Sequence, residues 1–192
     1  VDDPILGRLT VPGTGVQCPE QPPRMAPRQQ LVSGAAGLLS AWQAAHTEAP
    51  APSGETLAHP LEGVRVADLS RIIAGPVAAR VLAELGAEVT SLQSPTGLDW
   101  ALTFHLMFNP GKRSVTLDWS DDEGKAQLSR AIDHLKPDAV LHNYRHLKVA
   151  RDIGVGPEAL RERHPDIVYG HLNAYGDVGI WQKRPGFEQV VQ

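Results

Sequence analysis

The stretch LEGVRVADLSRIIAGPVAARVLA, residues 61–83, decides the fold of this protein. It opens with a nearly continuous apolar run at residues 64–69, which is typical of a strand covered on both faces. The turn RIIAGP follows, and its Pro76 suits the first helical position because no N–H is needed there. The next apolar residues share one helix face: Val77, Val81, Leu82 and Leu85. A strand that leads into a helix through a glycine-containing turn predicts an α/β fold with a ligand at the turn.

The same alternation continues along the chain. We expect strands at 87–93, 114–119, 139–144 and 166–172, and helices at 100–108, 120–135 and 157–164, with one more helix beginning near Pro185. Gly86 ends the first helix, and Ser120 with Glu123 predicts a capping box. Residues 145–156 are expected to form a loop with at most one helical turn. Strands that alternate with helices predict a parallel sheet flanked by helices.

Residues 1–60 differ from the rest of the chain, because they hold nine of its sixteen prolines. This density favours irregular, extended chain. One helix is expected at about 27–45, where Leu31, Ala35, Leu38, Leu39 and Trp42 form a stripe. The prediction is therefore a Pro-rich extension and linker over 1–60 and a main domain over 61–192. The domain is expected to continue beyond Gln192, since residues 187–191 resemble the first turns of a helix.

Composition and missing motifs exclude several functions. The formal net charge of −4 predicts neither nucleic-acid nor membrane binding, and the single cysteine, Cys18, favours a reducing, cytoplasmic setting. The sequence has no G-x-G-x-x-G, so a nicotinamide-dependent oxidoreductase is disfavoured, and it has no P-loop and no G-x-S-x-G. His142 and His146 are four residues apart, but they bracket a strand-to-loop transition rather than a helix face, so we expect no metal.

Polar groups follow three of the expected strands, at 71–74, 143–145 and 173–176. The carboxyl ends of parallel strands meet at one edge of the sheet, where open α/β folds bind ligands. Guanidinium, amide and aromatic groups there suit a phosphorylated, nucleotide-like ligand. The alternative is that these loops are merely solvated. The segment NPGKRS at 109–114 similarly looks either phosphate-binding or like a tight turn with two solvated cations.

Four ordered stretches resemble the class III CoA-transferases, the CaiB/BaiF family. They are LEGVRVADLSRIIAGPVAARVLAELGAEV, FNPGKRSVTLDWSDDEGKAQL, DAVLHNYR with IGVGPEALRERHPDIVY, and LNAYGDVGIWQKRPGFEQVVQ. Together they cover about residues 60–192. The resemblance implies a Rossmann-like domain that would pair with a smaller domain, and two full-length chains interlocked as a homodimer.

The resemblance also implies a reaction and a site. CoA or acyl-CoA would be a substrate rather than a permanently bound cofactor, and CoA would move between carboxylic acids through an acyl-enzyme on an aspartate. That aspartate would lie beyond Gln192. By motif position the CoA-binding residues are Arg71, Ile72, Ile73, Ala74, Leu117, Asn143, Tyr144 and Arg151, with Asp152 as the alternative to Arg151. Glu188 matches an acidic residue of the catalytic region.

The sequence departs from the family pattern at two positions, and these departures leave other functions open. Some transferases carry a glutamine where this chain has Ile73, and an isoleucine cannot stabilise the reacting acyl group. Racemases of the family place a catalytic histidine at the position of Phe187, so racemase chemistry is disfavoured. The expected function is therefore a CoA-transferase acting on acyl-CoA thioesters, and the alternative is a non-catalytic CoA-binding or scaffold module of the same fold.

Overall fold

A computed structural model describes residues 2–3, 7–8, 58–95, 106–177, 179–182 and 184–186. The chain divides into two compact units, residues 1–56 and 57–192. In the first unit β1 (Asp2–Asp3) pairs antiparallel with β2 (Gly7–Arg8). The helix expected at about 27–45 lies outside the described residues.

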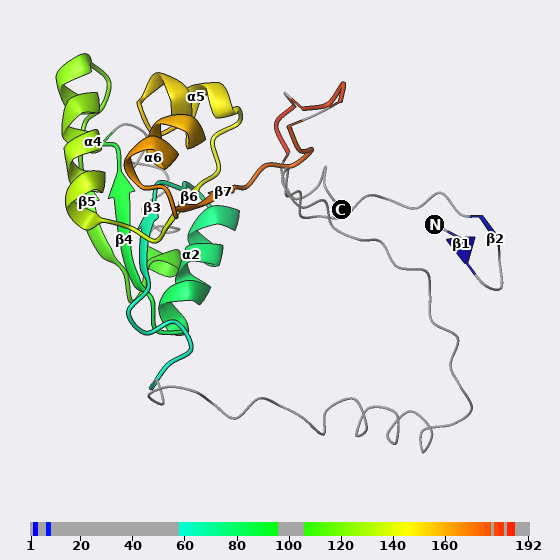
Figure 1. Cartoon of the computed structure of the whole chain (residues 1–192), viewed down its shortest axis with the longest axis horizontal. Helices are drawn as coiled ribbons and strands as arrows, with labels where there is room; N and C mark the ends of the chain where they lie inside the picture. The colour runs from blue at the N-terminus through cyan, green and yellow to red at the C-terminus, as the bar shows by residue number, and fades with distance from the viewer. Residues whose placement is uncertain are drawn as a thin grey trace. The chain divides into compact units, whose positions relative to one another are not determined.

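The second unit contains a five-stranded parallel sheet in the order β5-β4-β3-β6-β7 (Figure 1). Its strands are β3 (Arg65–Asp68), β4 (Glu88–Gln93), β5 (Arg113–Thr116), β6 (Ala139–His142) and β7 (Val168–His171). The chain builds the sheet outward from β3 to β5 and then crosses to β6 on the other side of β3. This order is Rossmann-like, and it confirms the predicted parallel sheet flanked by helices.

Two buried clusters, one on each face of the sheet, hold the helices in place. On one face Val66 and Val89 pack with Ala79 of α2 (Ala74–Glu84). On the other face the core includes Leu128 and Ile132 of α4 (Asp122–Leu135), Ala150 of α5 (Leu147–Asp152) and Leu160 of α6 (Pro157–Arg163). Adjacent residues of β3 serve opposite clusters, Val66 one and Ala67 the other, because strand side chains alternate between faces.

Several helix boundaries differ from the sequence expectation. Helix α2 begins at Ala74, two residues before Pro76, although Pro76 still lies in the first turn. The predicted capping box is wrong, because the N-cap of α4 is Asp121, whose carboxylate accepts a 2.8 Å hydrogen bond from the Gly124 N–H. The expected loop at 145–156 contains α5, which buries Ala150. Residues 184–186 are not helical, and Phe187 and Glu188 lie outside the described residues.

Candidate functional site

The loops that follow β3 and β6 meet at the centre of the sheet's carboxyl edge. Strands β3 and β6 are hydrogen-bonded neighbours, with Asp68 level with Leu141. After β3 the chain enters α2 on one face, and after β6 it continues to α5 on the other face. The chain therefore diverges at this point, which is where open α/β sheets form a ligand-binding crevice. Two of the three predicted polar segments, 71–74 and 143–145, lie there.

Asn143 fastens these two loops together. Its Oδ1 accepts a 2.8 Å hydrogen bond from the Arg71 N–H, and its Nδ2 donates a 2.7 Å hydrogen bond to the Arg71 carbonyl oxygen. Both polar atoms of the amide are thus engaged by the backbone of one residue. In this structure Asn143 acts on the turn after β3, which fixes the position of that turn against β6.

The turn itself has an unusual backbone. Ile72 has φ 70°, in the left-handed region that a β-branched residue rarely adopts. Such a residue costs on the order of 1–3 kcal/mol and persists only where its surroundings hold it. Ile73 is the N-cap residue of α2, and its side chain is 45% exposed. Ile72 and Ala74 are exposed as well, so three of the predicted site residues present an apolar surface at this edge of the sheet.

A buried ion pair between Lys112 and Asp68 fixes the turn that follows β3. The Nζ of Lys112 lies 2.8 Å from the Oδ2 of Asp68, and both side chains are 0% exposed. The same ammonium donates a 2.8 Å hydrogen bond to the carbonyl oxygen of Pro76, in the first turn of α2. The other carboxylate oxygen of Asp68 accepts hydrogen bonds from both the N–H and the hydroxyl of Ser70. The pair therefore holds both ends of the turn.

Sequence reasoning missed this pair. Both readings of the segment at 109–114 are wrong for Lys112, which is neither solvated nor directed at a phosphate, because its ammonium is buried against Asp68 and α2. Arg113, the second cation, lies 3.5 Å from the exposed Glu88. The charged Asp68 within an otherwise apolar buried strand was the available signal, since a buried carboxylate requires a partner.

Gly75 allows the close approach of the turn to β3. A Cβ atom at this position would lie 2.2 Å from the Cβ of Ser70 and 2.6 Å from its Oγ. Ser70 is itself fixed, because Asp68 binds its polar hydrogens and Gln93 Nε2 donates a 3.3 Å hydrogen bond to its carbonyl oxygen. No larger residue fits at position 75 without displacing the turn.

A second network, of stacked rings and hydrogen bonds, surrounds His142 at the end of β6, next to Tyr144. His142 is fully buried, and its ring stacks on those of Tyr144 and His171. Its Nδ1 accepts from the Tyr144 N–H, so its Nε2 carries the proton and donates 2.7 Å to the hydroxyl of Tyr169. Burial, together with the charge of His171, lowers the pKa of His142 to about 3. His142 is therefore a neutral structural residue at physiological pH.

The remaining predicted residues lie in different surroundings. Leu117 follows β5 and is half-buried against the core. Arg151 is exposed on α5, and its guanidinium makes two hydrogen bonds to Glu158, at 3.1 and 2.6 Å. That guanidinium lowers the pKa of Glu158 to about 2. Asp152, the alternative to Arg151, pairs instead with Lys148.

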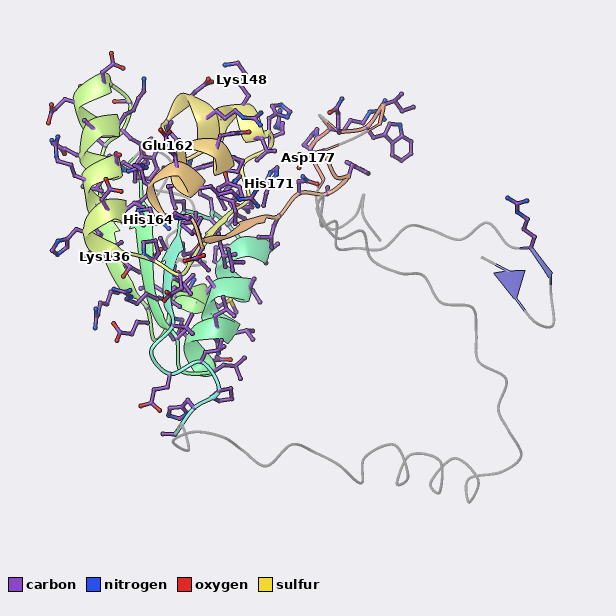
Figure 2. All side chains as sticks on the ribbon, viewed as in Figure 1. Lys136, Lys148, Glu162, His164, His171 and Asp177 are labelled. Carbon is purple, nitrogen blue, oxygen red and sulfur yellow. The ribbon has the colours of Figure 1, made fainter. Side chains whose placement is uncertain are left out.

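The third polar segment begins after β7. There His171 donates from Nε2 to the carbonyl oxygen of Tyr144, at 2.7 Å, and its Nδ1 lies 3.2 Å from the carboxylate of Asp177 (Figure 2). Asn173 also contacts Asp177, at 3.2 Å. His171, the last residue of β7, therefore supports the backbone of Tyr144, and the loop contacts His171 through Asp177.

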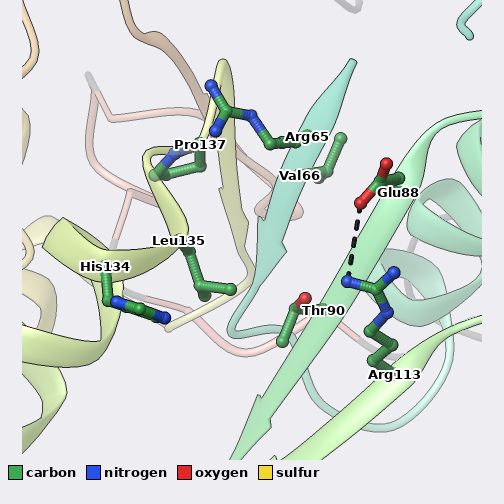
Figure 3. Close-up of a pocket in the computed structure, with 8 residues that line it drawn as sticks. All are labelled: Arg65, Val66, Glu88, Thr90, Arg113, His134, Leu135 and Pro137. Atoms are coloured by element: carbon green, nitrogen blue, oxygen red, sulfur yellow. Dashed lines mark ion pairs between the residues drawn. The ribbon is translucent and has the colours of Figure 1, made fainter. Parts of the chain in front are cut away.

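A pocket at the opposite edge of the sheet is a separate feature. Its lining comes from the amino ends of β3, β4 and β5 and from the end of α4 (Figure 3): Arg65, Val66, Glu88, Thr90, Arg113, His134, Leu135 and Pro137. Its two arginines are paired with Asp138 and Glu88. None of the predicted site residues lines it.

The described part of the chain lacks two further features, a cluster of metal ligands and a membrane-spanning helix. No three or more His, Cys, Asp or Glu side chains gather there as a metal ion would require. No helix among those residues is both long enough and apolar enough to cross a bilayer.

Comparisons with known proteins give consistent matches. The sequence model of CoA-transferase family III matches residues 61–192. The chain is 38% identical to the Mycobacterium tuberculosis protein named probable fatty acyl-CoA transferase Rv3272, over 70% of this chain and 36% of that protein. It is 30% identical to the succinate–glutarate CoA-transferase of Agrobacterium fabrum, over 69% of this chain and 37% of that enzyme.

Solved structures give the same result. The crystal structure of Rv3272 matches with a TM-score of 0.61, over 69% of this chain and 38% of that one. A CaiB/BaiF family protein from Brucella suis matches with a TM-score of 0.61 at 31% identity, over 69% of this chain and 38% of that one. The chain thus spans less than two-fifths of the length of these relatives.

Proposed function

The chain belongs to CoA-transferase family III, and we propose that its turn after β3 and its loop after β6 form the CoA-binding side of an enzyme that moves CoA between carboxylic acids. The observation that carries the proposal is the double hydrogen bond from Asn143 to Arg71. It fixes an exposed turn at the position where a parallel sheet of this order binds its ligand. The proposal rests on this geometry and on the family match together.

Each predicted residue has a role in the proposal. Residues 71–74 lie along the pantetheine and thioester part of CoA, with the guanidinium of Arg71 suited to a phosphate or carbonyl oxygen. The half-buried ring of Tyr144 offers an apolar face. Leu117 follows β5 and Arg151 lies on α5, and both would contact the nucleotide portion of CoA. Asn143 holds the turn.

The chemical step needs a carboxylate nucleophile. A carboxylate that attacks the thioester carbonyl releases the CoA thiolate and leaves an acyl anhydride on the enzyme. Asp68 lies at the correct edge, but its oxygens are occupied by Lys112 and Ser70 and its side chain is buried, so it does not serve. We assign the step to an aspartate outside the described residues, and Glu188 stays a prediction for the catalytic region on its motif position alone. An interlocked homodimer in the cytoplasm belongs to the same proposal.

We expect CoA to stabilise the protein expressed from its own gene. At 100 times its dissociation constant, CoA should raise the free energy of unfolding by about 2.7 kcal/mol, which thermal denaturation measures. Acyl-CoA donors incubated with succinate, glutarate or oxalate should yield a new acyl-CoA, detected by chromatography. NAD at the same concentration is the control and should not stabilise the protein. The absence of any shift with millimolar CoA would contradict the proposal.

The same assay distinguishes a transferase from the alternative, a non-catalytic CoA-binding scaffold. The exposed side chain of Ile73 favours it, because an aliphatic group at the turn can donate no hydrogen bond to an acyl oxygen. Stabilisation by CoA without turnover of any donor and acceptor pair would support the scaffold.

A further inference from the structure

We propose that the hydroxyl group of Tyr144 is a specificity-determining group of this site and donates a hydrogen bond to an oxygen acceptor of bound CoA. The inference rests on the proposed function and goes beyond it, since that function requires only the aromatic ring at this position. The observation behind it is a buried hydroxyl that the fold leaves unsatisfied.

The hydroxyl oxygen of Tyr144 is buried and has no hydrogen-bond partner among the residues that the structure describes. A buried polar group without a partner is costly, and most such groups in native structures are bonded. A phenylalanine would place the same ring in the same stack without this cost. The hydroxyl therefore calls for a partner that the described residues do not supply.

Tyr169 shows how this fold satisfies a structural hydroxyl. It accepts a hydrogen bond from His142, at 2.7 Å, and donates one to the carbonyl oxygen of Val155, at 3.1 Å. Both tyrosine rings contact the ring of His142, so they share one neighbourhood. The hydroxyl of Tyr169 thus forms two hydrogen bonds, whereas that of Tyr144 forms none with the described residues.

The charges that act on the Tyr144 phenol come from residues at the proposed CoA turn. Burial raises the pKa of Tyr144, while the charge of Arg71 lowers it and the charge of Asp68 raises it. Asp68 and Arg71 both lie near the start of the turn, so the charges that shift the pKa of Tyr144 belong to this part of the chain. Since burial dominates, the hydroxyl keeps its proton at neutral pH, and the proposed bond requires the atoms that cover it to move aside when CoA binds. The residue is half-buried, which leaves part of the ring open to a ligand.

The strongest oxygen acceptors of CoA are the carbonyl oxygens of its pantetheine or acyl part and the oxygens of its phosphates. Both are chemically suitable for a neutral phenol placed next to a guanidinium. Two fragments separate them, because pantetheine has only carbonyl oxygens and ADP has only phosphate oxygens as strong acceptors.

The test compares Tyr144→Phe with Tyr169→Phe, two deletions of a single buried hydroxyl. Tyr144→Phe should weaken CoA binding about 3–10-fold in calorimetry, the usual worth of one hydrogen bond. It should also raise the thermal midpoint of the unliganded protein by about 2–4 °C, because an unsatisfied group has been removed. Tyr169→Phe should lower the midpoint and leave the CoA affinity unchanged.

Each outcome decides the proposal. Unchanged CoA affinity in Tyr144→Phe overturns it, and so does a lowered midpoint, which would reveal a structural partner such as a buried water. Loss of affinity for pantetheine alone assigns a carbonyl acceptor, and loss for ADP alone assigns a phosphate. If CoA fails to bind even the unmodified protein, the proposed function itself is wrong, and the inference fails with it.

Discussion

Lys112→Met is expected to lower the free energy of unfolding by about 3–5 kcal/mol, the usual cost of leaving one member of a buried ion pair uncompensated. The methionine side chain fills a similar volume, so the loss comes from the charge of Asp68 and from the Pro76 carbonyl, which lose the same ammonium. Urea denaturation followed by circular dichroism measures the change. CoA affinity should fall as well, because both ends of the turn at 70–76 are released.

Two controls identify the cause. Lys148→Met removes a lysine of the same kind from an exposed pair with Asp152, where about 0–1 kcal/mol is expected. Adding Asp68→Asn to Lys112→Met removes the buried charge and keeps an oxygen for Ser70, so part of the lost stability should return. If Lys112→Met costs no more than Lys148→Met, the pair does not anchor the turn.

Asn143→Leu is expected to have the largest effect on CoA binding. It removes two partly buried hydrogen bonds and leaves the N–H and carbonyl of Arg71 without these partners, at about 1 kcal/mol for each bond. Ile72 then loses a support of its left-handed backbone. Because a displacement of about 1 Å can reduce turnover about 100-fold, we expect a loss of this order in transferase activity.

Asn143→Asp provides the graded comparison. The aspartate keeps an acceptor for the Arg71 N–H but cannot donate to the Arg71 carbonyl, so its CoA affinity should lie between those of the unmodified protein and Asn143→Leu. Calorimetry gives the three affinities. Equal CoA affinity in all three proteins would show that the fastened turn has no part in binding.

Local signals made much of the fold predictable from the sequence. Gly86 ends α2 with φ 103°, a conformation that glycine adopts freely, and Pro157 begins α6, where its missing N–H costs nothing. Competing local signals caused the errors. Ser120 and Asp121 are both good caps, and Asp121 is the one that reaches the N–H of Gly124. Helix α5 is only six residues long, too short for a clear periodic pattern.

The candidate site depended on contacts between residues far apart in the sequence. The strand ends were predictable, because any parallel sheet brings them to one edge. The pairing of Lys112 with Asp68 spans 44 residues, and that of Asn143 with Arg71 spans 72. No pattern along the chain specifies either contact. The partnership of Lys112 with Asp68 and that of Asn143 with Arg71 therefore emerge only from the folded structure.

The location of bound CoA tests the central claim most directly. A crystal structure of the protein expressed from its own gene, grown with CoA, should show the ligand along residues 71–74, next to Tyr144, with Asn143 still bonded to Arg71. Electron density for CoA at the opposite edge of the sheet, in the pocket lined by Arg65, Arg113 and His134, would contradict the account. So would CoA bound elsewhere with the turn at 71–74 left open to solvent.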